Sequence, residues 1–196
     1  MKKQEHWFRQ ALVEAGVGSF DTAGVSIDHH AGTCTFRDRT LPVIMPWSVI
    51  RACAEISLAR DLDYAFRGTR LPGREWVDRF RGMGEVAFTD RGRQIPKGEF
   101  DPEYYATLTR ARFALCPAGQ CPWTYRLLEA VACHAIPVCV EPWAWERSFV
   151  TLAPDGPHVY DAGVARSNYR TLLAQHSPAA IASMIGHLES GVASAS

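Results

Sequence analysis

From about residue 62 onward, short apolar runs alternate with segments whose apolar residues recur at helical spacing. Four runs are typical of strands, at 62–66, 85–89, 111–116 and 135–140. Helical segments accompany them, at 74–80, 101–110 and 122–133. Asp101 followed by Pro102 is a typical start of a helix. Strands that alternate with helices of this length predict an α/β fold, with right-handed βαβ units and a parallel sheet covered on both faces.

The pattern is less regular towards both ends of the chain. Residues 5–15 predict an amphipathic helix that ends at Gly16, and 17–40 predict loops or a small hairpin. A first strand is expected at 41–46 and a helix at 47–60; after the main run, 158–160 predict a fifth strand, followed by two helices. We therefore expect three parts: an extension at 1–40, the sheet domain at 41–190 and a frayed tail at 191–196.

Composition narrows the class of protein. Hydrophobic residues make up 47% of the chain and charged residues 21%, which is ordinary for a globular domain with a core. Lys and Arg total 21, as do Asp and Glu, so the chain lacks the net positive charge expected of a general nucleic-acid binder. No apolar run approaches 18 residues and the first ten residues lack a signal-peptide core, so we expect a cytoplasmic protein with no membrane partner.

Six cysteines raise the alternatives of disulfides or a metal site. Cys116 and Cys121 form a Cys-x4-Cys spacing without a second close pair, which is poor spacing for zinc. No Asp-x-Asp metal motif occurs either. We expect reduced thiols and no metal.

The ends of the predicted strands carry residues suited to an anion. Parallel sheets bind ligands at the carboxyl ends of their strands. Those ends are RGTR (67–70), DRGR (90–93), PAGQ (117–120) and EPW (141–143). Three of the four contain arginine or glycine, which let charge and backbone approach a phosphate.

Arg126 and Glu129 are the two charged residues of the helical segment at 122–133. Arg126 lies about one turn from the helix start, where free N–H groups and the helix dipole favour an anion, and Gly119 lets the preceding loop approach that anion. Glu129 follows three residues later and suits paired hydroxyls, as on a ribose. The alternative is an exposed Arg126–Glu129 ion pair of small energetic value.

The segment YYATLTRARFALCPAGQCPWTYRLLEAVACHAIPVCV (104–140) resembles the nucleotide-sugar-binding half of exostosin-like glycosyltransferases of family 47. Upstream, YAFRGTR, which contains Gly68, is similar to the family's F-x-G strand end. The chain departs from the family pattern at Arg110-Ala111, where serine is common, and at His134, where glycine is usual. The residues that carry the resemblance are Tyr105, Phe113, Leu115, Pro117, Gly119, Trp123, Thr124, Arg126, Glu129, Ala130, Ile136, Pro137 and Val138.

This resemblance implies the Rossmann-like C-terminal domain of a GT-B fold, which binds a UDP-sugar or similar donor. By the same resemblance, Arg126 contacts the diphosphate and Glu129 the ribose or the sugar. Pro117, Gly119, Thr124 and Gly68 are expected to line the donor site. Arg67 or Arg70 is expected to assist Arg126.

No catalytic base follows from the sequence. Asp90 and Asp161 lie at predicted strand ends and are candidates. His29-His30 fit either a base, a metal ligand or a polar loop, and His134 fits a helix end. Trp143 and Trp145 fit stacking on a base or sugar, or a place in the core.

Only 40–60 residues precede the recognisable domain, fewer than a second Rossmann unit needs. Three explanations stay open: a minimal transferase completed by a partner chain or a second copy, a donor-binding module without catalysis, or a piece of a larger protein. The leading hypothesis is glycosyl transfer from a nucleotide-sugar to a hydroxyl acceptor, without a cofactor beyond the donor. The alternatives are a non-catalytic binding or scaffolding module and a purely structural domain.

Overall fold

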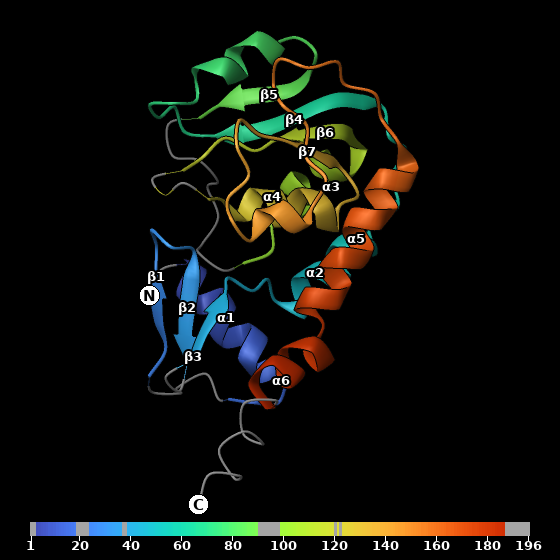
Figure 1. Ribbon diagram of the computed structural model, residues 1–196. Helices are drawn as coiled ribbons and strands as arrows, with labels where there is room; N and C mark the ends of the chain where they lie inside the picture. Colours follow the sequence, from blue (N-terminus) through green and yellow to red (C-terminus); the bar gives the residue numbers. More distant parts are fainter. Residues whose placement is uncertain are drawn as a thin grey trace, which may run out of the picture.

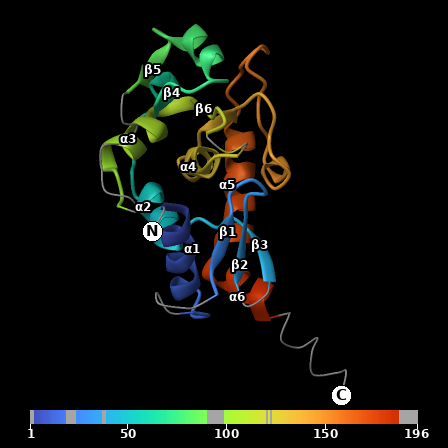
Figure 2. The same ribbon diagram turned by 90° about the vertical axis from the view of Figure 1, so that its left-hand side faces the viewer.

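The computed structural model describes residues 3–18, 24–36, 39–89, 99–119, 121 and 123–186 (Figure 1). Two sheets organise these residues. One is a four-stranded parallel sheet, and the other is a three-stranded antiparallel sheet that lies beside helices α1 and α6 (Figures 1 and 2). The parallel sheet positions the candidate site, because its strands end at a common edge.

The parallel sheet has the strand order β5-β4-β6-β7. Its strands are β4 (Leu62–Gly68), β5 (Gly84–Phe88), β6 (Ala111–Leu115) and β7 (Ile136–Val138). All neighbouring pairs are parallel, with Tyr64 opposite both Gly84 and Phe113. The predicted α/β class and the four central strands are confirmed.

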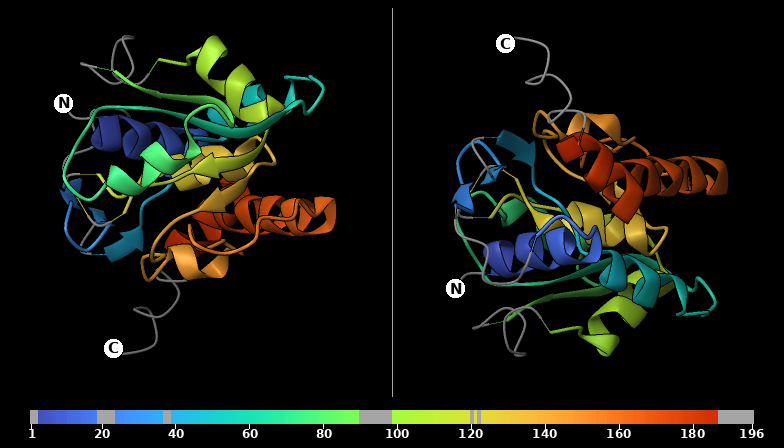
Figure 3. Two further views of the ribbon diagram at one scale, coloured as in Figure 1. Left: turned by 90° about the horizontal axis from the view of Figure 1, so that it is seen from above. Right: turned by 90° about the horizontal axis from the view of Figure 1, so that it is seen from below.

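Both faces of this sheet are covered, as parallel sheets require. Ala65 and Ala114 face one core, with α3 (Pro102–Arg110) and α4 (Tyr125–Ala132). Phe66 and Phe113 face a second, smaller core with the 3-10 helix η1 (Glu75–Phe80) and the start of α5 (Ala162–His176). Seen from above, α3 lies towards the β5 side of the sheet and α5 towards the β7 side (Figure 3).

Helix starts follow the capping residues. The Asp101 carboxylate accepts a hydrogen bond from Tyr104 N at 3.0 Å, so α3 begins where the sequence predicts. The predicted helix start at Pro122 lies outside the described residues; α4 begins at Tyr125 with Thr124 as its N-cap. The helix predicted at 74–80 is present as the 3-10 helix η1.

The N-terminal segment is part of the main core. It consists of α1 (Lys3–Glu14), the antiparallel strands β1 (Ser26–Asp28), β2 (Thr33–Phe36) and β3 (Arg39–Pro42), and α2 (Trp47–Ala54). Trp7 on α1 is fully buried and packs edge-to-face on Tyr125 of α4, with ring centroids 4.9 Å apart. The last helix, α6 (Pro178–Gly186), packs against α1. One continuous core therefore joins the predicted extension to the sheet domain.

Two predicted strands differ from the structure. Residues 43–45 are buried without strand structure; only the start of the 41–46 run pairs, as the end of β3. Residues 158–160 form no strand, because the edge of β7 bonds instead to Leu152 through an isolated bridge with Val138. A short apolar run in the sequence does not by itself show whether the segment pairs in a sheet or lies buried in an extended form without pairing.

Candidate functional site

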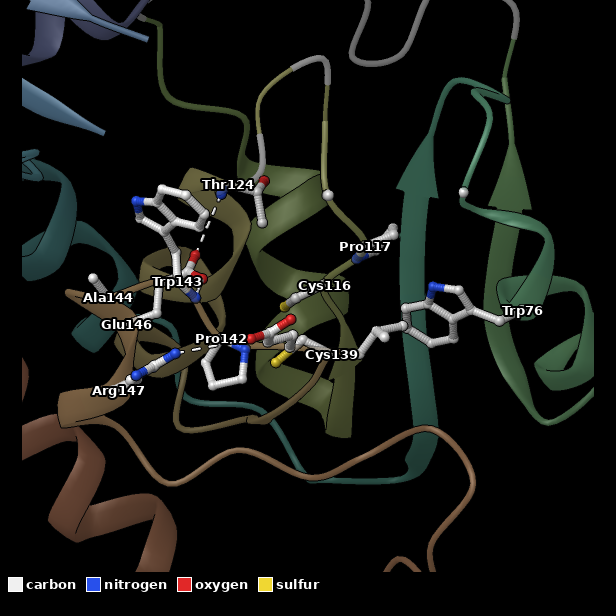
Figure 4. Close-up of a pocket in the computed structure, with 14 residues that line it drawn as sticks. Trp76, Cys116, Pro117, Thr124, Cys139, Pro142, Trp143, Ala144, Glu146 and Arg147 are labelled. Carbon is white, nitrogen blue, oxygen red and sulfur yellow. Dashed lines mark hydrogen bonds and ion pairs between the residues drawn. The ribbon is translucent and has the colours of Figure 1, made fainter. Parts of the chain in front are cut away.

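A cavity of about 470 Å³ opens at the carboxyl ends of β6 and β7 (Figure 4). Its walls come from the loop after β6, from Thr124 at the start of α4, from the loop 139–147, and from Gly73 and Trp76 after β4. Its volume is in the usual range for small-molecule sites, about 300–1,000 Å³. The location is the one that parallel α/β sheets use for ligands.

Arg126 lies in the first turn of α4, next to this cavity. Thr124 caps the helix by accepting a hydrogen bond from Arg126 N at 3.2 Å. The guanidinium lies over the Phe66 ring, 4.6 Å from its centroid, and Nη2 donates to the carbonyl oxygen of Arg67 at 2.8 Å. Nε and Nη1 are buried and have no hydrogen-bond partner among the described residues. Buried donors of a cation without acceptors are costly, so this geometry favours an anion as the missing partner.

Arg74 is a second arginine at this position, and the sequence analysis did not identify it. Only 7% of it is exposed. Its Nε donates to the carbonyl oxygen of Ala118 and its Nη1 to that of Thr69, both at 2.8 Å. Burial, together with the nearby charge of Arg126, lowers the pKa of Arg74 to about 10. Arg74 was assigned to the helix predicted at 74–80, so it was not considered as a strand-end residue. The feature that could have identified it is its position just after the Leu71-Pro72-Gly73 turn that follows β4.

Because Gly68 has no side chain, the guanidinium groups of Arg126 and Arg74 can both lie against it. A β-carbon at Gly68 would lie 3.0 Å from Nη2 of Arg126 and 3.4 Å from Nη1 of Arg74. In the part of the chain that the structure describes, no carboxylate forms an ion pair with either guanidinium. The guanidinium groups of buried Arg74 and half-buried Arg126 thus lie next to each other at the end of β4.

The other predicted arginines have different roles. Arg67 contributes its carbonyl oxygen to Arg126, and its side chain is half-buried. Arg70 is exposed and forms two hydrogen bonds with Asp78, at 2.7 and 3.0 Å. Arg74, and not Arg70, is therefore the arginine placed beside Arg126.

The loop after β6 adds the predicted proline and glycine. Pro117 is buried and lines the cavity. Gly119 N donates to Cys121 O at 3.1 Å, and a β-carbon on Gly119 would lie 3.6 Å from Nη2 of Arg74. This loop therefore runs directly past the arginine pair.

Glu129 lies elsewhere, and this corrects its predicted placement beside the ligand. The residue is 1% exposed, and its carboxylate accepts hydrogen bonds from Tyr104 Oη at 3.0 Å and Tyr105 Oη at 3.1 Å. Both tyrosines belong to α3, which packs on α4. An exposed ion pair with Arg126, the alternative interpretation, is also excluded by this burial. The helix directs Arg126 to the end of β4 and Glu129 into the core.

Asp161, one of the two predicted catalytic candidates, does not line the cavity. Asp161 is the N-cap of α5 and accepts a hydrogen bond from Gly163 N at 2.6 Å. The neighbouring Tyr160 Oη donates to His134 O, just before β7, so Asp161 lies at the amino ends of the strands. Asp90 lies outside the described residues. His134 adopts a φ of 57° after α4, the conformation that the family's usual glycine accepts easily.

The β1–β2 turn of the N-terminal segment contacts the cavity wall. Trp143 lines the cavity and donates from Nε1 to Ala31 O at 3.0 Å, and Trp123 Nε1 donates to His29 O at 2.8 Å. Gly32 has a φ of 64°, and a β-carbon at this position would lie only 2.7 Å from Trp145 Nε1. The tryptophans therefore hold the turn that carries His29 and His30 beside the cavity.

Glu146 was also missed by the sequence analysis. It lines the cavity but is only 3% exposed, and burial raises the pKa of its carboxyl group. Its Oε2 accepts from Trp143 N at 2.6 Å and its Oε1 from Thr124 N at 3.3 Å (Figure 4). Glu146 thereby joins the loop before α4 to the loop after β7.

All six cysteines are free thiols. Five of them are buried, and Cys121 is half-buried. The described residues contain no group of three His, Cys, Asp or Glu side chains placed to hold a metal ion. Within those same residues, no helix has the length and apolar character needed to cross a membrane.

Comparison with known proteins gives short matches to plant glycosyltransferases. No family model matches the chain. It is 51% identical over 39 residues to a protein of Oryza sativa subsp. japonica named a probable glucuronosyltransferase, covering 20% of this chain and 9% of that protein. A second rice protein of the same description is 49% identical over 63 residues, covering 28% and 15%. A probable beta-1,4-xylosyltransferase of Arabidopsis thaliana is 51% identical over 37 residues, covering 19% and 9%. The chain thus matches 9% to 15% of the length of these relatives, whose names indicate glycosyltransferases.

Proposed function

We propose that the protein binds a nucleotide-sugar donor, with the diphosphate on Arg126 and Arg74, and transfers the sugar to a hydroxyl acceptor. The observation that carries this proposal is the pair Arg74 and Arg126 over Gly68. Among the described residues, the buried Nε and Nη1 of Arg126 have no hydrogen-bond partner, and neither guanidinium has a carboxylate partner. A diphosphate supplies both the negative charge and the acceptor oxygens that this pair needs.

The chemistry of glycosyl transfer fits such a site. The bond between the sugar's anomeric carbon and the diphosphate oxygen breaks, a bond to the acceptor oxygen forms, and the acceptor hydroxyl loses its proton. Negative charge grows on the departing diphosphate. Two fixed guanidinium groups stabilise that charge more than they stabilise the intact donor, which is the requirement for catalysis. In this proposal the described residues bind and neutralise the leaving group, and the catalytic base is unassigned.

The names of the relatives support the reaction class and suggest the donors. Glucuronosyl and xylosyl transfer both use an activated sugar. We extend this to a UDP-sugar donor and to the donor half of a GT-B enzyme, as the resemblance to exostosin-like glycosyltransferases implies. The residues that bind the acceptor are unassigned in this proposal.

Calorimetric titration of the wild-type protein with uridine, UMP, UDP and pyrophosphate tests the proposal. We expect affinity to rise with each phosphate and pyrophosphate alone to bind, because the arginine pair recognises phosphate. Equal affinities for uridine and UDP, or no binding of any of the four, would contradict the proposal.

A second candidate function is donor binding without transfer. Release of UDP from UDP-xylose or UDP-glucuronic acid in the presence of a hydroxyl acceptor separates the two functions. Binding of UDP with no release of UDP favours the binding module.

A further inference from the structure

Glu146 is the buried acidic side chain of the cavity. The other carboxylate that lines it, Glu141, is exposed and lies 3.8 Å from Arg147. Glu146 is 3% exposed, yet it belongs to the cavity wall and not to the core behind it. Buried carboxylates need several hydrogen bonds to offset the loss of hydration.

The two hydrogen bonds of Glu146 leave acceptor capacity on both oxygens. Oε1 accepts one bond, from Thr124 N, and Oε2 accepts one, from Trp143 N. Each carboxylate oxygen can accept about two hydrogen bonds. The raised pKa of the carboxyl group, caused by burial, is consistent with incomplete compensation of its charge. Glu146 can therefore accept at least two further donors, one on each oxygen.

The position of the arginine pair indicates which part of a donor reaches Glu146. Arg74 bonds to Ala118 O, and Ala118 lines the cavity. Thr124 caps the helix at Arg126 N and bonds to Glu146 through its own backbone N–H. Ala118 and Thr124 therefore lie between the arginine pair and the cavity, and Glu146 contacts Thr124 on the cavity side.

The remaining walls of the cavity are largely apolar. Trp76 lies on one side and Pro142 and Trp143 on the other (Figure 4). Such walls suit the flat faces of a base or a sugar ring but leave ring hydroxyls without partners. A carboxylate with free acceptor sites on this wall provides those partners.

We propose that Glu146 accepts hydrogen bonds from a pair of hydroxyls on a ring sugar of the donor, either the ribose or the transferred sugar. This inference rests on the proposed function and deepens it. It transfers to Glu146 the hydroxyl-binding role that the resemblance to exostosin-like enzymes implies for Glu129, whose carboxylate is enclosed by Tyr104 and Tyr105.

Titrations of the wild-type protein with five ligands test the inference: UDP, 2′-deoxy-UDP, 3′-deoxy-UDP, UDP-xylose and UDP-glucuronic acid. If Glu146 binds the ribose, UDP should bind roughly 10- to 150-fold more tightly than at least one deoxy analogue. If it binds the transferred sugar, at least one UDP-sugar should bind more tightly than UDP by a similar factor. Wild-type protein that discriminates in neither comparison overturns the inference.

Glu146→Gln then assigns the discrimination to this side chain. We expect the preference found in the wild type to fall to within about threefold, because a single amide oxygen replaces two charged acceptors. Glu55→Gln, on an exposed glutamate at the end of α2 that does not line the cavity, is the control and should keep the preference. If Glu146→Gln fails to fold, Glu146→Asp provides the comparison, since it moves the carboxylate by one methylene.

A role for Glu146 in joining the loops alone gives a different result. Affinities for all five ligands would then fall by the same factor, and the preference would be unchanged, which overturns the inference while UDP binding through the arginine pair stands. Failure of the wild type to bind UDP would instead overturn the proposed function, and the inference with it.

Discussion

Arg74 and Arg126 reach the end of β4 from two different elements, and each places a guanidinium nitrogen within 3.4 Å of the point where a β-carbon on Gly68 would lie. Both are held by backbone carbonyl oxygens, and no carboxylate of the described residues pairs with either. Burial of Arg74, together with repulsion from Arg126, lowers the pKa of Arg74 to about 10. Two like charges held close together, with unpaired buried donors on Arg126, favour the binding of an anion.

The first prediction concerns Gly68→Ala. The added methyl group would lie 2.9 Å from Phe66 Cζ and 3.0 Å from Arg126 Nη2, so the ends of these side chains must move. We expect a folded protein whose affinity for UDP is roughly 10-fold lower or weaker still, because charged hydrogen bonds depend on geometry. Calorimetric titration measures the affinity, and circular dichroism checks the fold.

Gly156→Ala is the control for this substitution. Its β-carbon would meet only Ala153 O, at an ordinary distance of 3.7 Å. It should bind UDP like the wild type. Wild-type affinity in Gly68→Ala as well would show that the arginine pair does not need its present geometry.

Part of this site could be predicted from the sequence. Arg126 was expected near a helix start from local signals, a glycine-containing loop followed by a helical pattern, and it lies in the first turn of α4. Its role in anion binding stays a prediction. Arg74 could not be found in this way, since its role depends on how the chain turns after β4. Glu146 lies in an irregular loop, where no periodicity indicates which side chain is buried. Glu129 shows the opposite failure: its spacing from Arg126 suggested a shared ligand, but the packing of α3 on α4 encloses it.

For the fold as well, the features that depend on local sequence signals could be predicted, and those that depend on tertiary packing could not. The central strands and α3 were predicted from their apolar runs and from the Asp101 cap, which are local signals. The run at 41–46 was misassigned in part, because Val43 to Met45 are buried by α5 and the core and not by pairing in a sheet. Tertiary contacts decide such segments, and the sequence pattern alone does not contain them.

The second prediction concerns Glu129→Ala. It removes the acceptor of two tyrosine hydroxyls in the core and leaves a cavity, so the free energy of unfolding should fall by about 2–5 kcal/mol. The affinity of the folded protein for UDP should stay within about threefold of the wild type. Urea unfolding measures the first quantity and titration the second.

Glu141→Ala, at an exposed glutamate, is the matched control and should change the free energy of unfolding by no more than about 0.5 kcal/mol. Wild-type stability combined with lost UDP binding in Glu129→Ala would show that Glu129 contacts the ligand after all.

The third prediction concerns pH. His176 is 3% exposed, and its Nδ1 accepts a hydrogen bond from Met45 N at 3.0 Å, which requires the neutral ring. Burial lowers the pKa of His176 to about 4, from a usual value near 6.5. Between these values the unfolded chain binds more protons than the folded protein, so the free energy of unfolding should decrease as the pH falls from about 6.5 to 4. The decrease from this group should be about 3 kcal/mol.

His176→Asn separates this effect from other titrations. The asparagine oxygen can accept the Met45 N–H bond but does not titrate in this range. Urea unfolding at several pH values between 4 and 7.5 should show a shallower pH dependence in His176→Asn. An unchanged slope would mean that folding does not lower the pKa of His176.

The central claim, that a phosphate group lies between Arg74 and Arg126, is tested most directly by titrating Arg126→Ala with UDP and with uridine. Arg74→Ala is the parallel variant. Arg70→Ala is the control, because Arg70 lies in the same loop after β4 as Arg74 but is paired with Asp78. We predict that Arg126→Ala and Arg74→Ala each weaken UDP binding by about 1.5–3 kcal/mol, roughly 10- to 150-fold, and change uridine binding far less. Arg70→Ala should bind UDP like the wild type. Wild-type UDP affinity in Arg126→Ala, or equal losses for UDP and uridine, would contradict the account.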